Sequence, residues 1–469
     1  MSRRAIIAVA AAALLWAPAA LADSFSKTDG VFVADDGTQL ATTLYEPTSA
    51  RSAAGYPAIV MFHGLGGKRQ DMNQIAEQSF ANEGYAVLTF DARGHAQSGG
   101  LFSADGAREV ADFRGLFDRL AARPEIDRAH IGAWGISLGG GAVWASVTNG
   151  IPFAAGEVVE TWTDLYSALL PQDLSKSGLL LGFLASVPAD RTSPELLGLK
   201  GPALGSTDLP ALRAFAGSRS SRAKLSSVTT PMFMFQGRRD YAFDIDQAWQ
   251  GFTRLKGPRR LYIGDFGHPP STFPGPDVAV VLAEGSDWFD RFLKGTPNGI
   301  DKRPPVELAA QPFAEAGAHS YPGLPPTKTL SWTLSGSNTL TGNKAVSRPV
   351  HLPKALVETF GGPTVKVTVS GSFPHLIAAL NARLPDGTQL VVSQGGLALK
   401  PSSKPRPVTI RLLAFATTLP AGTKLSLTFT PVTTGANIVY LLSSVPNSAT
   451  ITIGRAVLTL PVLARPISG

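Results

Sequence analysis

A short run of glycines around one serine constrains the fold of this chain more than any other segment. Residues 131–141 read IGAWGISLGGG, an apolar strand that leads directly into a Gly-x-Ser-x-Gly turn. In a sharp strand-to-helix turn of this kind the serine is held at strained φ/ψ angles, so the residues two before and two after it must be small. Gly135 and Gly139 meet that requirement, and Ser137 is therefore the candidate nucleophile.

Strands and helices alternate on both sides of this turn. The pattern predicts apolar strands over 58–62 and 86–90, a polar helix over 71–83 between them, and helices over 108–122 and 137–147. Such alternation is typical of parallel βαβ units in which helices cover both faces of the sheet. The sequence therefore predicts an α/β architecture.

Further elements open and close this unit. Residues 30–47 alternate between apolar and polar around an Asp-Asp-Gly turn, which predicts an antiparallel hairpin. Two more strands are expected over 231–235 and 260–263, followed by a helix over 278–294.

The chain changes character outside this alternation, and its length favours two or three domains. We expect the α/β domain over 23–300, with a helical cap inserted at about 162–224, where Leu, Ser, Gly and Pro are frequent and no strand is predicted. The Pro- and Gly-rich residues 301–326 predict a linker. Short alternating strands over 327–469 predict a β-sandwich of the jelly-roll type.

The N-terminus has the pattern of an export signal. Two arginines precede the apolar residues 5–16 and a small-residue tail that ends at Ala22, so cleavage before Asp23 is expected. The Sec and twin-arginine routes both stay open, because Ser-Arg-Arg stands before the apolar run. That run is too short to span a bilayer, and no later apolar stretch has membrane length. We expect a secreted or periplasmic protein without a membrane span.

Composition excludes several other classes. The chain has no cysteine, so neither a disulfide nor a lipid-modified cysteine can hold it. Its formal net charge is +7, but the basic pairs at 238–239 and 259–260 are isolated, which argues against binding to nucleic acid. No metal or cofactor is expected, because the histidines lack ligand spacing and no glycine-rich phosphate loop follows a strand.

Two residues farther along the chain complete the requirements of a nucleophilic serine. A serine hydroxyl needs a histidine to accept its proton and an acid to orient that histidine. Asp240 and His268 each follow a predicted strand, in the order Ser, Asp, His that α/β-hydrolases use. Both are expected at the same edge of the sheet as Ser137. Asp244 is a rival acid.

An acyl-transfer site also needs two hydrogen-bond donors aimed at the developing oxyanion. The backbone amide of Leu138 is one candidate. The loop 63–67, His-Gly-Leu-Gly-Gly, follows an apolar strand, and Leu65 is the second candidate. A merely flexible glycine turn is the alternative interpretation of this loop.

Other polar residues near the strand ends could either stabilise the structure or bind substrate. Arg93 is expected to pair with Asp91 and fix the loop after the strand at 86–90. Glu157 and Glu160 are the first carboxylates to consider for holding a substrate amine, although such residues more often face solvent or pair with a basic neighbour.

Taken together, the mature chain resembles the X-prolyl dipeptidyl peptidase and bacterial cocaine esterase group of α/β-hydrolases. Four segments in the same order carry the likeness. They are Asp-Ala-Arg-Gly at 91–94 with Ser-Gly-Gly at 98–100, the serine turn, WFDRFLKG at 288–295, and RLPDG at 383–387.

The resemblance implies that Ser137, Asp240 and His268 form a catalytic triad, that the cap shapes the acyl pocket, and that a C-terminal jelly roll packs on the catalytic domain. One departure concerns the oxyanion hole. Members similar to cocaine esterase have a tyrosine in the loop after the early strand, whereas this chain has His-Gly-Leu-Gly-Gly at 63–67, so a backbone donor must substitute.

Three functional hypotheses follow. The leading one is a secreted serine hydrolase that cleaves carboxylic ester bonds through an acyl-enzyme intermediate. The second is an X-prolyl dipeptidyl peptidase-type serine peptidase, and the third is a surface- or carbohydrate-binding protein with a vestigial hydrolase domain. For the first two, the expected partner is a small-molecule ester or a short peptide.

Overall fold

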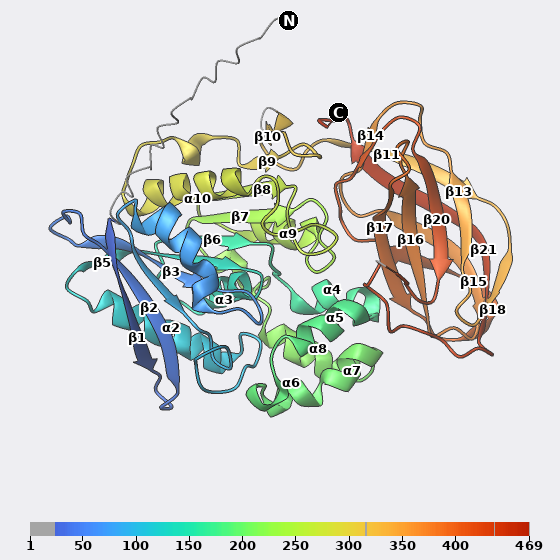
Figure 1. Ribbon diagram of the computed structural model, residues 1–469. Helices are drawn as coiled ribbons and strands as arrows, with labels where there is room; N and C mark the ends of the chain where they lie inside the picture. Colours follow the sequence, from blue (N-terminus) through green and yellow to red (C-terminus); the bar gives the residue numbers. More distant parts are fainter. Residues whose placement is uncertain (1–23, 315–316, 436, 469) are drawn as a thin grey trace, which may run out of the picture.

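The computed structural model describes residues 24–314, 317–435 and 437–468. The expected signal peptide, 1–22, lies outside these ranges. An α/β body occupies the left of Figure 1 and an all-β body the right, with a group of short helices below and between them. No helix in the described ranges is long and apolar enough to cross a membrane.

A ten-stranded mixed sheet is the centre of the α/β body. Its strand order is β1-β2-β4-β3-β5-β6-β7-β8-β9-β10, parallel from β4 to β9 and antiparallel at both ends. The predicted hairpin and the five predicted parallel strands are confirmed. The strands are β1 (Phe25–Val33), β2 (Gln39–Pro47), β3 (Tyr56–Phe62), β4 (Ala86–Phe90), β5 (Ile126–Ile136), β6 (Ala155–Val159), β7 (Met232–Gly237), β8 (Arg259–Gly264), β9 (Val306–Leu308) and β10 (His319–Tyr321).

Helices cover both faces of this sheet because successive strand residues point to opposite sides. Along β3, Ala58, Val60 and Phe62 belong to the core under α2 (Ala107–Ala121), α3 (Leu138–Thr148) and α9 (Ile245–Arg254). Ile59 and Met61 belong to the core under α10 (Val278–Leu293), which crosses the upper part of Figure 1. The polar helix predicted over 71–83 is divided into the 3-10 turn η1 (Arg69–Met72), α1 (Asn73–Ile75) and the π-helix η2 (Ala76–Ala81).

The stretch between β6 and β7 is helical, as predicted. Within 162–224, which the structure describes in full, five α-helices occur and no extended strand. Their apolar side chains join Phe102, Leu138 and Phe243 of the α/β body in one cluster. The helices are α4 (Leu165–Leu169), α5 (Ser177–Ala185), α6 (Pro194–Gly198), α7 (Lys200–Gly205) and α8 (Leu209–Ser218), with the 3-10 turns η3 (Pro171–Asp173) and η4 (Ala189–Arg191); η5 (Leu225–Ser227) follows them.

The C-terminal body consists of antiparallel sheets around one core. A five-stranded and a four-stranded sheet share a single cluster of buried side chains, and a two-stranded ribbon pairs separately. This matches the predicted all-β sandwich. The strands are β11 (Thr327–Leu334), β12 (Asn338–Thr341), β13 (Val346–Val350), β14 (Val357–Glu358), β15 (Thr364–Gly371), β16 (His375–Arg383), β17 (Gln389–Ala398), β18 (Ser402–Arg411), β19 (Thr418–Leu419), β20 (Lys424–Thr430) and β21 (Thr450–Leu463).

The segment predicted as a linker, 301–326, differs from that expectation in one respect. It contributes β9 and β10 to the edge of the main sheet, with β9 parallel to β8 and Val306 and Leu308 fully buried. The 3-10 turn η6 (Ile300–Lys302) precedes them. These two strands were not predicted because each has only three residues and the segment around them is rich in proline.

Candidate active site

Ser137 occupies a strained turn between β5 and α3. Its φ is +54° and its ψ −114°, a conformation that non-glycine residues rarely adopt. A Cβ at Gly135 would lie 2.2 Å from the carbonyl oxygen of Gly139, and a Cβ at Gly139 would lie 2.0 Å from that of Phe62. Both positions therefore require glycine, which is stricter than the small residue that the sequence pattern predicted.

The carboxyl ends of β5, β7 and β8 bring three predicted residues into a hydrogen-bonded chain. Ser137 Oγ lies 2.9 Å from Nε2 of His268, and Nδ1 of His268 lies 2.8 Å from Oδ2 of Asp240. These distances are those of normal hydrogen bonds. The two bonds use both imidazole nitrogens, so the ring can pass a proton to or from the serine while the carboxylate holds its orientation.

The carboxylate of Asp240 is completely buried, and backbone donors satisfy it. Its Oδ1 accepts the amides of Ala242 and Phe243 at 2.8 and 2.9 Å, and its Oδ2 also accepts the amide of His268 at 3.2 Å. Because a buried charge without partners costs several kcal/mol, these bonds keep the side chain in one position.

Asp244, the rival acid, has a different set of contacts. Its Oδ2 accepts the amide of Ala414 in the C-terminal body at 2.8 Å, and the residue stands at the N-cap position of α9. Burial raises the pKa of this carboxyl to about 6. The structure therefore places Asp240 on the imidazole and uses Asp244 as a link between the two bodies.

The loop 63–67 lies against the serine turn. A Cβ at Gly64 would be 3.8 Å from Cβ of Ser137, and Leu65 and Leu138 line the same pocket as the serine. Across the described part of the chain, the amides of Leu65 and Leu138 donate to no protein acceptor. Both are thus free to donate to a ligand beside Ser137.

His63 fixes this loop from behind. Its Nε2 accepts the amide of Ala92 at 2.9 Å, and its Nδ1 lies 2.7 Å from the carbonyl oxygen of Gly64. Burial lowers the pKa of the imidazole, which suits a neutral ring that accepts at one nitrogen and donates at the other. The loop is therefore held rather than flexible.

Glu160 was not expected beside the histidine. It directly follows β6, with φ +40°. Its Oε2, which has no hydrogen-bond partner in the described chain, lies 3.9 Å from Nδ1 of His268. Burial raises the pKa of the Glu160 carboxyl. Glu160, Asp240 and His268 lie close enough to hold a metal ion, but the direct bond between Asp240 and His268 favours a proton relay.

Opposing effects act on the pKa of the His268 imidazole. Burial lowers the pKa of the His268 imidazole, but the negative charges of Asp240 and Glu160 outweigh it, so the net pKa is raised. The rings of Phe243 and Phe183 flank the imidazole with centroids 5.2 and 6.3 Å away.

A buried lysine connects the cap to the turn that carries the acid. Nζ of Lys176 donates to the carbonyl oxygens of Tyr241 and Ala242 at 2.7 and 2.9 Å, and burial lowers the pKa of the amine to about 8. Sequence reasoning missed this residue, since a single lysine before a Leu-rich helix carries no recognisable pattern.

The C-terminal body supports the same turn from the other side. Arg238, which is fully buried, forms an ion pair with the buried Glu358, and Arg239 donates to the carbonyl oxygen of Val391 at 3.1 Å. Glu358 also accepts the amide of Ile467 at 2.8 Å. The basic pair 238–239 thus joins the two bodies rather than forming a charged surface.

Arg93 does not pair with Asp91, so that prediction was wrong. Arg93 binds Asp112 at 2.7 Å and Asp36 at 2.8 Å, whereas Asp91 pairs with Arg69 at 2.6 Å. The side chain of Arg93 extends toward α2 and the first hairpin, where two carboxylates are available. The loop is fixed as expected, but by long-range partners.

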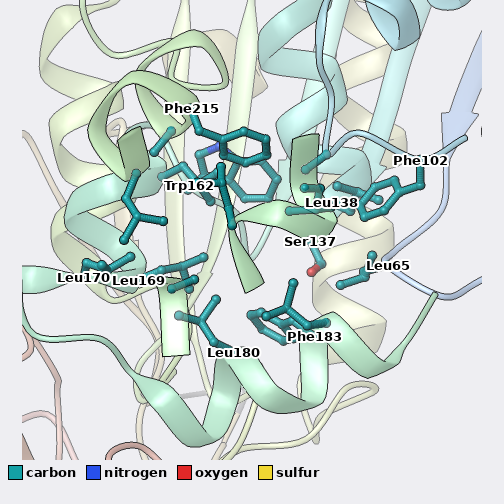
Figure 2. A pocket seen from close by; sticks show the side chains of 18 of the residues that line it. Leu65, Phe102, Ser137, Leu138, Trp162, Leu169, Leu170, Leu180, Phe183 and Phe215 are labelled. Atoms are coloured by element: carbon teal, nitrogen blue, oxygen red, sulfur yellow. The ribbon is translucent and has the colours of Figure 1, made fainter. Parts of the chain in front are cut away.

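An apolar pocket of about 120 Å³ opens beside the serine (Figure 2). Apart from Ser137, its lining residues are apolar or aromatic and none carries a titratable group. Glu157 is not among them, because it is buried under α10, where its Oε2 would lie 2.6 Å from a Cβ at Gly285. Representative lining residues are Leu138, Trp162, Leu170, Leu180, Phe183 and Phe215.

Comparison with known proteins agrees with this architecture. Residues 36–270, half of the chain, match the sequence profile described as X-Pro dipeptidyl-peptidase (S15 family). The chain belongs to that family. X-Pro dipeptidyl-peptidase family members are hydrolases, and this chain is therefore a hydrolase of the serine class.

Solved structures share the two-body fold of this family member. A CocE/NonD family hydrolase from Staphylococcus aureus is 16% identical, with a TM-score of 0.71 over 93% of this chain and 94% of that one. A selenomethionine-labelled α-amino acid ester hydrolase is 14% identical, with a TM-score of 0.66 over 96% and 99%. At these identities the likeness establishes the α/β-hydrolase fold with its antiparallel C-terminal region.

A curated relative matches only a part of the chain. The quorum-quenching protein AidA of Acinetobacter baumannii is 32% identical over 141 residues, which are 30% of this chain and 45% of that protein. The chain thus spans less than half the length of this relative.

Proposed function

We propose that this protein cleaves carboxylic esters through an acyl-enzyme intermediate. Ser137 is the nucleophile, His268 the general base and acid, Asp240 the residue that orients the imidazole, and the amides of Leu65 and Leu138 are the oxyanion donors. The observation that carries the proposal is the chain of 2.9 and 2.8 Å hydrogen bonds from Ser137 through His268 to Asp240 at the mouth of an apolar pocket.

The chemistry runs in two halves. His268 Nε2 accepts the hydroxyl proton as Ser137 Oγ attacks the ester carbonyl, and the two amides stabilise the negative charge that develops on the carbonyl oxygen. The imidazolium then gives its proton to the departing alcohol. Water, deprotonated by the same nitrogen, attacks the acyl-enzyme, and the proton returns to the serine as the carboxylic acid leaves.

Ester cleavage is favoured over removal of a dipeptide because the pocket offers no anion. A dipeptidyl peptidase must bind the free ammonium group of its substrate, and burying an unpaired ammonium costs several kcal/mol. Glu157 is buried under α10 and Glu160 lies beside His268, so neither carboxylate lines the pocket. The family's printed name still makes X-prolyl dipeptidyl peptidase activity the second candidate.

A vestigial hydrolase domain that only binds a surface or a carbohydrate has less support. A protein that only binds needs none of three features present here. They are the glycines of the serine turn, the hydrogen bonds of the relay, and the two unpaired amides beside Ser137.

The test is the kcat/KM of the purified protein on p-nitrophenyl esters and on X-Pro-anilides. We expect ester turnover that Ser137→Ala reduces by roughly 10⁴-fold or more. Retention of ester turnover in Ser137→Ala contradicts the assignment of the nucleophile, and a preference for X-Pro-anilides favours the peptidase.

Export is the remaining part of the proposal. The N-terminal pattern supports cleavage before Asp23, and N-terminal sequencing of protein recovered from the medium or periplasm tests it.

A further inference from the structure

We infer that the pocket beside Ser137 binds the acyl chain, and that the preferred substrates are esters of alkanoic acids of about four to six carbons without a charged group near the carbonyl. This inference rests on the proposed ester hydrolase function and specifies its substrate class.

The chemistry of the walls selects an uncharged alkyl group. The indole Nε1 of Trp162 donates to the carbonyl oxygen of Arg219 at 2.9 Å, so the polar atom of that ring is already used. The nearby Lys176 directs its amine to the carbonyl oxygens of the acid turn. An ammonium or carboxylate on the acyl chain would thus lose its water without gaining a partner.

The position of the reacting atoms sets the direction of the chain. In Figure 2 the hydroxyl of Ser137 points into the pocket from one side, next to Leu65, and Leu169 and Leu170 lie at the opposite side. With the carbonyl oxygen at the amides of Leu65 and Leu138, the pocket space that remains for the substrate extends from Ser137 toward α4.

The volume limits the length of that chain. The space is about 120 Å³. Because an apolar protein cavity of about 150 Å³ holds the six carbons of one benzene molecule, this smaller pocket suits an acyl chain of about four to six carbons.

The cap supplies most of this surface, which explains why the sequence pattern did not predict it. Leu165, Leu169 and Leu170 come from α4 and its end, and Leu180 and Phe183 from α5. Leu180 is buried, whereas its neighbour Leu181 is 40% exposed and lies outside the pocket. This pair of adjacent leucines provides a variant and its matched control.

The experiment measures kcat/KM on p-nitrophenyl esters with acyl chains from about two to sixteen carbons. We expect a rise of roughly fourfold per methylene up to the length that fills the pocket, and a fall beyond it. An ester with an amino group on the α-carbon should react at least tenfold more slowly than the plain ester of equal length.

Three variants test whether the effect comes from the pocket. Leu180→Trp fills it and should move the optimum to shorter chains, lowering the hexanoyl-to-acetyl ratio of kcat/KM at least tenfold. Leu181→Trp should leave this ratio unchanged. Ala203→Leu, also in the lining, gives the same direction of change where the larger replacement does not fold.

The outcomes separate the two levels of the proposal. A protein that hydrolyses the acetyl ester with no dependence on acyl length, or that follows the length of the alcohol in a series of butyrate esters, overturns the inference and leaves the ester hydrolase standing. A folded protein inactive on every ester contradicts the proposed function itself.

Discussion

Oε2 of Glu160 lies 3.9 Å from Nδ1 of His268, the same nitrogen that bonds to Asp240. Two carboxylates therefore face one side of the imidazole, each from the end of a different strand. Only Asp240 is satisfied by backbone donors, while Oε2 of Glu160 has no hydrogen-bond partner in the described chain. We therefore propose that Glu160 is a positioning residue, which acts by raising the pKa of His268, the proposed base.

Glu160→Gln should lower the pKa of His268. The negative charge of Glu160 favours the imidazolium, and the base must be neutral to accept the serine proton, so its removal should extend activity to lower pH. The measurement is the pH dependence of kcat/KM, which reports the free enzyme. Glu83→Gln, at an exposed position, is the control. An unchanged acid limb in Glu160→Gln contradicts this role.

Asp240→Asn should lower kcat by roughly 10⁴-fold while the fold is retained, because the amide favours the wrong tautomer of the imidazole. Asp244→Asn should have a much smaller effect on kcat, since its carboxylate contacts the amide of Ala414. Steady-state kinetics of the two variants distinguish the two acids. Equal losses of kcat would contradict the assignment of Asp240 as the acid that orients His268.

Arg238→Met should destabilise the protein by about 3–5 kcal/mol, because it leaves the carboxylate of Glu358 buried without its partner. Chemical denaturation measures the loss. The double variant Arg238→Met, Glu358→Leu removes the orphaned charge and should recover part of it. If the double variant is no more stable than the single one, the ion pair is not the source of the effect.

Gly139→Ala should disrupt the serine turn, since its Cβ would lie 2.0 Å from the carbonyl oxygen of Phe62. Overpacking of this kind costs about 1–3 kcal/mol or more, and both the thermal midpoint and ester turnover should fall. Gly182→Ala in α5 is the matched control: a Cβ there meets nothing within 4 Å, and the change should stabilise by about 0.5–1 kcal/mol. Equal behaviour of the two variants would contradict the steric argument.

The sequence was most informative where local geometry restricts residue choice. The serine turn needs glycine at 135 and 139. Ser137, Asp240 and His268 each follow a parallel strand of one sheet, so their loops lie at the same edge. The alternation of strands and helices predicted the α/β body for the same reason: each period reflects which face of an element is buried.

Long-range packing limited what could be predicted. The strands β9 and β10 have only three residues each and lie in a Pro-rich segment, so the sequence pattern did not indicate them. The partners of Arg93 are Asp112 on α2 and Asp36 in the first hairpin, which are distant in sequence. The cap forms a pocket only when helices α4 to α8 meet, so its leucines indicated burial but not shape.

In the proposed mechanism, Ser137 is the activated nucleophile of the relay. The most direct test of this role is labelling of the purified protein with a fluorophosphonate, followed by peptide mapping by mass spectrometry. We expect a single adduct on Ser137 that forms far more slowly in His268→Ala. A folded protein that stays unlabelled, or an adduct on another serine, would contradict this role.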